Sequence, residues 1–225
     1  MENPVFIVGL QSEAKILRQY GYHQVGISGG DRLIAQKTTQ LFIQKKAKGI
    51  ISFGFAGGLD PSIPVGGIII PTAIRTIDNL LFDVHQNWHK KIINLMAGIR
   101  IYSGTMLGSD NPIIEKKIKA DIYHKFGTIG VDMESHVVAS ICNKNNVPFC
   151  AIRVVIDTAN TSLSKQTADI MQKDGSISVS RAIKTILNYP SALKELMILG
   201  KQYHHAHRQL NNVARLGVPN FGFGL

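Results

Sequence analysis

The sequence predicts an α/β fold in three layers, with helices on both faces of a twisted, mostly parallel central sheet. Short β-branched runs such as residues 5–9 and 147–156 alternate with longer amphipathic segments along the chain. This alternation is typical of parallel strands joined by helical crossovers. No internal repeat or obvious linker precedes residue 189 of the 225 residues. We therefore expect a single domain over residues 1–225, with residues 190–225 as a C-terminal helical extension.

The first third of the chain predicts three strands with helices between them. Each strand is a short apolar run that ends or begins at glycine. The strands are expected at residues 5–9, 25–28 and 49–53. The helices are expected at residues 12–20 and 31–48. The glycine-rich residues 54–61 (GFAGGLDP) then predict a loop directly after the third strand.

The remainder of the chain continues the alternation. Extended segments are expected at residues 65–72, 73–78, 99–105, 128–131 and 147–156. Helices are expected at residues 87–97, 111–126, 133–145, 176–187 and 190–216. Asn111-Pro112 predicts the start of its helix, because a cap residue precedes a proline at the first helical position. Residues 157–160 (DTAN) end the last strand.

Composition narrows the class of protein. The hydrophobic fraction of 44% and the charged fraction of 18% suit a folded globular chain. Two cysteines exclude a disulfide framework and a four-cysteine zinc site. The first residues lack the basic segment of a signal peptide, and no apolar run approaches the ~20 residues of a membrane span. We expect a cytoplasmic protein, whose net charge of +10 suits an acidic partner such as phosphate or an anionic membrane surface.

Two glycine-rich stretches are candidate anion sites, because ligands bind beyond the carboxyl ends of parallel strands. Ala56 and Gly57 belong to the stretch after the third strand, where free N–H groups can cradle an anion. Gly29, Gly30 and Arg32 lie at a helix start, which also attracts anions. The alternatives are a tight turn in the first case and an ordinary helix cap in the second.

Carboxylates follow two further strands. Glu134 lies at the start of a helix, where we expect it to stay ionised and to accept hydrogen bonds from a sugar diol. Asp157 ends the strongest strand, four residues after Arg153. The two form either a buried ion pair or a site in which partial burial raises the pKa of Asp157 for proton donation. His204, His205 and His207 lie on one helix without an acidic neighbour, and we expect no metal site there.

Three segments taken together resemble the nucleoside phosphorylase and nucleosidase superfamily. They are FAGGL (55–59) with PVGGIII (64–70), VDMES (131–135), and NVPF (146–149) with RVVIDTA (153–159). Their order and spacing agree with the family over most of residues 4–189. The resemblance implies a phosphorylase-like α/β fold and cleavage of the N-glycosidic bond of a purine nucleoside.

The resemblance also implies roles for individual residues. Glu134 would hold the ribose hydroxyls, with Met133 packed against the sugar. Asp157 would donate a proton to purine N7, and Glu13 would lie near an attacking water. Arg32 and Arg153 would be the candidates for a phosphate. Phe55 and Ile156 depart from the nucleosidases, which have serine at both positions.

The chemistry requires neither a metal nor a redox cofactor, although phosphate would serve as co-substrate in a phosphorylase. An oxocarbenium-like transition state needs a neutralised leaving base, a steadied sugar and a positioned nucleophile. Asp157, Glu134 and an anion loop match those three needs.

Two subfamilies compete, and the sequence resembles the hopanoid-associated phosphorylases more closely. These are similar over the whole length, which implies adenine release from adenosylhopane, a lipid-linked nucleoside. The methylthioadenosine/S-adenosylhomocysteine nucleosidases are similar around Glu134 and Asp157. A third hypothesis is a catalytically silent nucleoside-binding or membrane-associated protein. Family members are usually homo-oligomers, and we expect no nucleic-acid partner.

The residue pattern of the last helix predicts one of two arrangements. The helix either contacts a membrane surface or packs on its own domain. Its basic residues recur every seven positions, at Lys194, Lys201, Arg208 and Arg215. An adjacent, mostly apolar stripe comprises Leu193, Leu196, Gly200, Tyr203, Leu210 and Ala214. Phe221 and Phe223 follow among glycines. Such a helix suits anionic headgroups or, equally, a packed apolar face with a solvated basic face.

Overall fold

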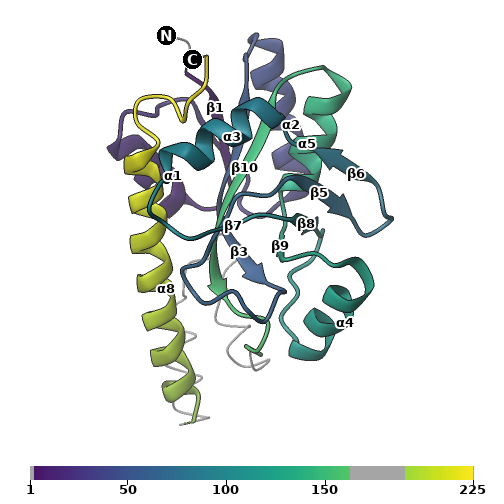
Figure 1. The fold of residues 1–225 in the computed structure, drawn as a ribbon, viewed down its shortest axis with the longest axis vertical. Helices are drawn as coiled ribbons and strands as arrows, with labels where there is room; N and C mark the ends of the chain where they lie inside the picture. The colour runs from purple at the N-terminus through teal and green to yellow at the C-terminus, as the bar shows by residue number, and fades with distance from the viewer. Residues whose placement is uncertain (1–2, 163–190, 225) are drawn as a thin grey trace.

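A computed structural model describes residues 3–162 and 191–224 and contains a ten-stranded mixed sheet with helices on both faces (Figure 1). The strands are β1 (Val5–Val8), β2 (Val25–Ile27), β3 (Ile50–Gly58), β4 (Ile68–Ile69), β5 (Ala73–Thr76), β6 (Leu81–Asp83), β7 (Ile101–Tyr102), β8 (Thr105–Gly108), β9 (Gly130–Asp132) and β10 (Phe149–Asp157). The helices are α1 (Gln11–Gln19), α2 (Arg32–Gln44), α3 (Gln86–Leu95), α4 (Lys116–Phe126), α5 (Ser135–Lys144) and α8 (Ser191–Leu216). The predicted fold class is confirmed.

The strand order explains why helices cover both faces. The main path runs β6-β5-β8-β9-β3-β10-β4-β7, while β1 pairs with β2 and β3. The crossover from β1 to β2 and the crossover from β2 to β3 run in opposite directions along the sheet. Because such crossovers are right-handed, they place α1 and α2 on opposite faces. Helix α1 then packs against α8, and α2 packs against α5.

Strand β3 organises the centre of the sheet, and its length corrects the predicted loop at residues 54–61. It continues to Gly58, because β10 pairs with it in parallel from Phe149↔Ile50 onward. Its first half also pairs with β1, whereas Gly57 and Gly58 pair with β9 in antiparallel fashion. Strands β1 and β9 therefore end toward each other beside the middle of β3.

The core is built from these central strands and from the C-terminal tail. Strand β1 is buried at every residue, as expected for a strand covered on both faces. The rings of Phe6, Tyr22 and Phe53 surround Phe221, which is fully buried. The Trp88 indole N–H donates to the carbonyl of Phe221 at 2.9 Å. The tail aromatics expected near a membrane thus pack into the domain, where apolar rings are removed from water.

Helix α8 lies against the domain along its C-terminal half. Ala206, Leu210, Val213 and Ala214 are buried at the spacing of one helical face, in contact with α1, β3 and β10. Leu210 and Ala214 therefore belong to the core and not to an exposed apolar stripe. The N-terminal half extends away from the sheet (Figure 1). Leu193, Lys194 and the helix expected at residues 176–187 lie outside the part whose side chains the structure describes.

Helix α4 begins at Lys116, five residues after the predicted start at Asn111. Asn111 instead turns back on Ser109, whose hydroxyl donates to the Asn111 carbonyl at 2.7 Å. The backbone N–H of Lys116 finds its partner in the Ser162 hydroxyl at 3.1 Å. A cap from a distant loop cannot be seen in the local Asn-Pro signal. The other described helices begin and end within a few residues of the predicted positions.

Candidate active site

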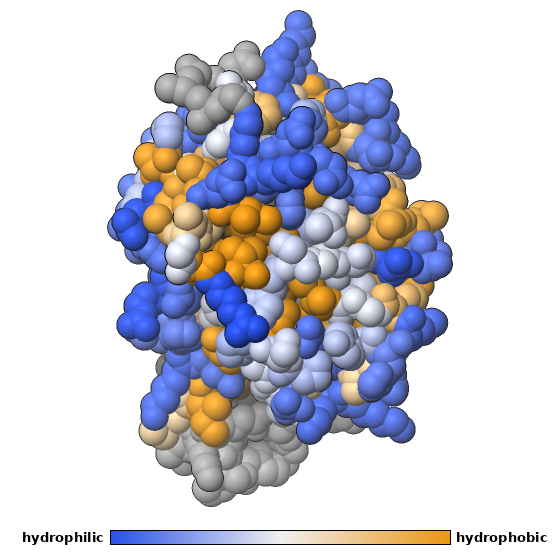
Figure 2. Space-filling view, viewed as in Figure 1, coloured by the Kyte–Doolittle hydropathy of each residue, from blue (hydrophilic) through white to orange (hydrophobic). Residues whose placement is uncertain are grey.

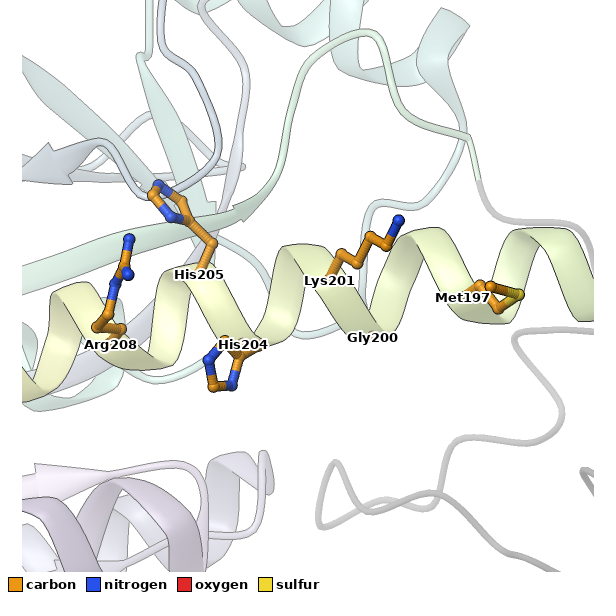
Figure 3. Close-up of a pocket in the computed structure, with 6 residues that line it drawn as sticks. All are labelled: Met197, Gly200, Lys201, His204, His205 and Arg208. Atoms are coloured by element: carbon orange, nitrogen blue, oxygen red, sulfur yellow. The ribbon is translucent and has the colours of Figure 1, made fainter.

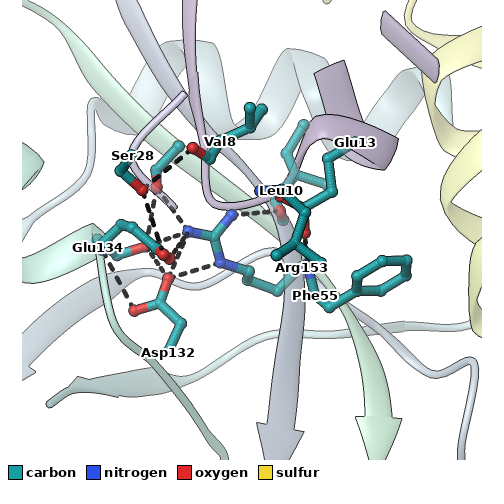
Figure 4. A network of polar contacts seen from close by, with 11 residues as sticks. Val8, Leu10, Glu13, Ser28, Phe55, Asp132, Glu134 and Arg153 are labelled. Atoms are coloured by element: carbon teal, nitrogen blue, oxygen red, sulfur yellow. Dashed lines mark hydrogen bonds and ion pairs between the residues drawn. The ribbon is translucent and has the colours of Figure 1, made fainter. Parts of the chain in front are cut away.

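Glu13 and Glu134 meet where β1 and β9 end beside β3. Glu13 lies in the first turn of α1, and Glu134 lies between β9 and α5. A Cβ atom at Gly9 would lie 2.8 Å from the Glu134 carboxylate, and one at Gly54 would lie 2.3 Å from Glu13. Only glycine leaves room for both carboxylates at these two positions. Figure 4 shows the two acids on opposite sides of the Arg153 guanidinium.

Backbone donors fix the Glu13 carboxylate. The N–H of Leu10 donates to Oε2 and the N–H of Phe55 donates to Oε1, each at 2.8 Å. Burial raises the pKa of Glu13, while Arg153 and the N–H donors oppose that rise. Burial thus makes the Glu13 carboxylate a stronger proton acceptor than an exposed one. Its geometry and pKa both suit a general base.

The charge of Glu134 differs from the expectation for a helix N-terminus. Its carboxylate accepts from the Ser28 hydroxyl at 3.4 Å and lies 3.7 Å from the Arg153 guanidinium. Burial, with a further contribution from the Asp132 carboxylate, raises the pKa of Glu134 to about 8, although Arg153 opposes the rise. Desolvation thus outweighs the helix dipole here. The expectation that Glu134 stays ionised is wrong for the ligand-free protein at neutral pH. Met133, beside it, is half-buried.

Arg153 pairs with Asp132, a residue to which the sequence assigned no ligand-binding role. Its Nε donates to the Asp132 carboxylate at 2.6 Å, and Nη2 donates to the Ser52 hydroxyl at 2.6 Å. Of the two alternatives for Arg153 and Asp157, the ion pair between them is therefore wrong. The register between β10 and β3 shifts between Val155 and Asp157, so the simple alternation of strand faces does not apply.

Asp157 has a different partner, Lys119 of α4. The Lys119 ammonium donates to Asp157 Oδ2 and also to the carbonyl of Thr158 at 2.9 Å. Burial raises the pKa of Asp157, and Lys119 acts in the opposite direction. A Cβ at Gly57 would lie 3.5 Å from Asp157 Oδ1, so the carboxylate lies beside the end of β3.

Strand β3 therefore carries the candidate groups along its length. The Glu13 carboxylate lies beside Gly54 and accepts from the N–H of Phe55, and the Asp157 carboxylate lies beside Gly57. At about 3.3 Å per residue, these positions are roughly 7–10 Å apart. Glu13 therefore lies beside the middle of β3, and Asp157 lies nearer its C-terminal end.

The residues of the two predicted anion sites make contacts within the protein. Ala56 and Gly57 lie within β3 and pair with Val155 and Asp157 of β10, so they do not form a free loop. Gly29 and Gly30 form a turn with positive φ angles of 65° and 72°. Arg32 extends to the Asp110 carboxylate at 2.9 Å, which also faces His136 at 3.0 Å. Both candidate arginines, Arg32 and Arg153, thus already have carboxylate partners.

A separate surface pocket lies on α8, and none of the three acids lines it. Its volume is about 430 Å³, and its described lining comprises Met197, Gly200, Lys201, His204, His205 and Arg208 (Figure 3). His204 and His205 point to different sides of the helix.

Within residues 3–162 and 191–224, no group of three metal-ligating side chains lies close enough to hold an ion. No helix in the same part of the chain is long and apolar enough to cross a membrane.

Comparisons with curated proteins find nucleosidases. The chain is 28% identical over 145 residues to 5′-methylthioadenosine/S-adenosylhomocysteine nucleosidase of Bacillus velezensis, a match that covers 56% of this chain and 63% of the relative. The corresponding protein of Staphylococcus aureus is 25% identical over 186 residues, covering 72% and 79%. The chain thus matches somewhat less than two thirds of the length of the Bacillus relative.

Solved structures share the fold. The 5′-methylthioadenosine/S-adenosylhomocysteine nucleosidase of Neisseria meningitidis, in complex with methylthio-immucillin-A, has a TM-score of 0.69 and 16% identity, over 96% of this chain and 99% of that chain. Futalosine hydrolase of Helicobacter pylori has a TM-score of 0.68 and 16% identity, over 96% and 98%. Residues 26–188, most of the chain, match the family described as the Phosphorylase superfamily. Because this family match covers most of the chain, the chain belongs to the Phosphorylase superfamily.

Proposed function

We propose that this protein hydrolyses the N-glycosidic bond of a purine nucleoside. The observation that carries the proposal is the placement of three acids near β3: Glu13 and Glu134 lie together near the middle of the strand, and Asp157 lies near its C-terminal end. Their spacing matches a substrate that has a sugar at one end and a base at the other. The similarity to nucleosidases supports the same reaction class.

Each acid has one task in the proposed reaction. Glu13 accepts a proton from a water molecule whose oxygen bonds to C1′. The C1′–N9 bond breaks, and its electron pair leaves with the purine. Asp157 gives a proton to N7, so that the base departs neutral. Glu134, once ionised, accepts hydrogen bonds from the ribose 2′- and 3′-hydroxyls and stabilises the oxocarbenium-like sugar.

Water is favoured over phosphate as the nucleophile. A phosphate would need free cationic groups, yet Arg153 is bound to Asp132 and Arg32 is bound to Asp110. Gly57, the other candidate, is engaged in the sheet. The Asp132 carboxylate, which is paired with Arg153, would also repel an anion. Phosphorolysis remains an outcome that the assay below distinguishes.

For the substrate, we propose adenosylhopane, with methylthioadenosine or S-adenosylhomocysteine as the alternative. The whole-length resemblance to hopanoid-associated phosphorylases supports the first, and the curated relatives support the second. Phe55, in place of the serine of the nucleosidases, packs its ring 5.8 Å from that of Tyr203. This aromatic pair lies beside the Glu13 end of the site and favours an apolar substituent. The pairing of Glu13 with the Phe55 N–H argues against a catalytically silent protein.

An exposed apolar patch supports the proposal that this protein forms a homo-oligomer. Ile77, Leu80 and Leu81 are exposed around the β5–β6 turn, which forms the apolar right-hand edge in Figure 2. Such a patch suits a second copy of this chain. Sedimentation should give a homo-oligomer that Leu80→Glu dissociates. A monomeric wild type contradicts this assignment.

The exposed half of α8 suits the surface of an anionic membrane. Met197 and Ile198 are 57% and 47% exposed, and the exposed side chains of Lys201 and Arg208 line the same surface pocket as Met197. The full-length chain should sediment with anionic vesicles at low salt, and Lys201→Gln with Arg208→Gln should weaken that binding. A chain that stays in the supernatant contradicts membrane contact. Truncation near residue 189 is unsuitable, because it would remove the core residues Leu210 and Phe221.

The direct test is adenine release, measured by chromatography with and without phosphate. The substrates are adenosylhopane, methylthioadenosine, S-adenosylhomocysteine and adenosine. We expect release without phosphate and a free sugar hemiacetal as the second product. A sugar 1-phosphate would show phosphorolysis, and no release from any substrate would overturn the proposed function.

A further inference from the structure

We propose that Lys119 is a positioning residue for Asp157: its ammonium holds one carboxylate oxygen and stabilises the charge that forms when Asp157 gives its proton to the purine. This inference rests on the proposed function. It concerns a side chain that the reaction described above does not use.

Lys119 is fully buried, which is rare for a lysine and requires compensation. It lies on the apolar face of α4, three and four residues before Ile122 and Tyr123, which pack against the cluster of Leu59, Leu107 and Val131. An apolar residue at this position would complete that face. The sequence of α4 places an ammonium there instead.

The contacts of Lys119 account for all three of its donors. Nζ donates to Asp157 Oδ2, to the Thr158 carbonyl at 2.9 Å and to the Thr161 carbonyl at 3.3 Å. An ammonium has three N–H groups, so none is left for a ligand. The same contacts tie the turn after β10 to the carboxylate. Lys119 therefore fixes both the position of Asp157 and the backbone that carries it.

Exposure separates the two members of the pair. The Lys119 side chain is 0% exposed, whereas that of Asp157 is 22% exposed. Lys119 thus lies behind the carboxylate, and Asp157 lies between it and the open side. A ligand can reach Asp157 without touching Lys119, so Lys119 acts only through Asp157.

The charge of Lys119 helps the proton transfer. Before the reaction, burial favours the protonated form of Asp157. As the C1′–N9 bond breaks, the proton moves from Asp157 to N7 and a carboxylate remains beside the ammonium. Lys119 keeps its own proton throughout. The attraction therefore grows as the proton leaves, and an interaction that strengthens in the transition state raises the rate.

The test is a double-mutant cycle of Lys119→Met with Asp157→Asn, measured as adenine release. We expect Lys119→Met alone to lower kcat about 10–100-fold, with a smaller change in KM, since one charged hydrogen bond is worth roughly 1.5–3 kcal/mol. In the Asp157→Asn background the same substitution should cost less than about 2-fold, because coupled residues are not additive. Equal losses in both backgrounds would overturn the proposal. Lys117→Met, an exposed lysine on the same helix, is the matched control and should be silent.

A second measurement does not depend on activity. The carboxyl ¹³C resonance of Asp157 should titrate at higher pH in Lys119→Met than in the wild type, because Lys119 lowers the pKa of Asp157. An unchanged titration overturns the proposal, even if the wild type releases no adenine and the proposed function fails. Circular dichroism checks folding, and Lys119→Gln, which keeps two donors without the charge, replaces Lys119→Met if that variant unfolds.

Discussion

The two ends of the candidate site pair carboxyl groups with cations in different ratios. At the sugar end, Glu13, Asp132 and Glu134 surround the single guanidinium of Arg153, and all four side chains are buried. At the base end, Asp157 has one ammonium, and its side chain is partly exposed. The first arrangement has an excess of acid, whereas the second is balanced.

This difference indicates how one sheet can carry both a proton-accepting region and a proton-donating region. An excess of carboxyl groups around one cation suits a region that accepts protons and stabilises a positive sugar. A single carboxyl group, whose pKa burial raises and beside which a cation lies, suits a region that gives a proton away. Environment, and not residue type, assigns the roles.

The largest expected effect comes from the base end. Asp157→Asn should lower the rate of adenine release by about 10²–10⁴, because it removes the proton donor. Steady-state kinetics provide the measurement. Asp121→Asn, an exposed position on α4, is the control and should keep the wild-type rate. Wild-type turnover by Asp157→Asn would remove this residue from the mechanism.

Stability should depend most on the cation of the sugar end. Arg153→Met leaves several buried acids without their counter-charge, so the free energy of unfolding should fall by about 3–5 kcal/mol. Urea denaturation measures the change. Arg32→Met breaks an exposed pair and should cost about 1 kcal/mol or less. Equal losses in the two variants would mean that the buried network is no more important than a surface pair.

Glu134→Gln should separate sugars by their 2′-hydroxyl. The charged acceptor is lost, so kcat/KM for ribosides should fall about 10-fold or more, and that for 2′-deoxyribosides should fall less. The comparison uses adenosine and 2′-deoxyadenosine with the same enzyme preparation. Identical losses for the two substrates would leave Glu134 as a helix cap only.

The buried acid of the sugar end also predicts a pH dependence of stability. The pKa of Glu134 is raised from its ordinary value to about 8 in the folded protein, so the folded state binds more protons than the unfolded state between these values. The free energy of unfolding should therefore fall as pH rises from about 4.5 to 8, by at most roughly 1.4 kcal/mol per pH unit from this group. Glu134→Gln should reduce the slope. A slope that the substitution leaves unchanged would place the titration elsewhere.

The sequence predicted the fold, and the positions of the three acids after strands, better than the partners of these acids. Strand–helix alternation places the ends of β1, β9 and β10, and the acids follow those ends. The partners were missed because they come from distant segments. Lys119 of α4 donates to Asp157, and Asp132 of β9 accepts from Arg153. One signal was present, since Lys119 shares a helical face with Ile122 and Tyr123. The continuation of β3 through Gly58 could not be seen, because its glycines suggest a loop until β10 pairs with them.

The division between the sugar end and the base end has one direct test. The measurement is kcat/KM for adenosine and for 4-nitrophenyl riboside, whose leaving group needs no proton, with Asp157→Asn and Glu134→Gln. We expect Asp157→Asn to lose activity on adenosine by about 10²-fold or more and to retain most of its activity on the nitrophenyl riboside. Glu134→Gln should lose activity on both to a similar degree, because both contain the same sugar. If Asp157→Asn impairs the two substrates equally, the carboxyl group does not serve the leaving base, and the proposed division of the site is wrong.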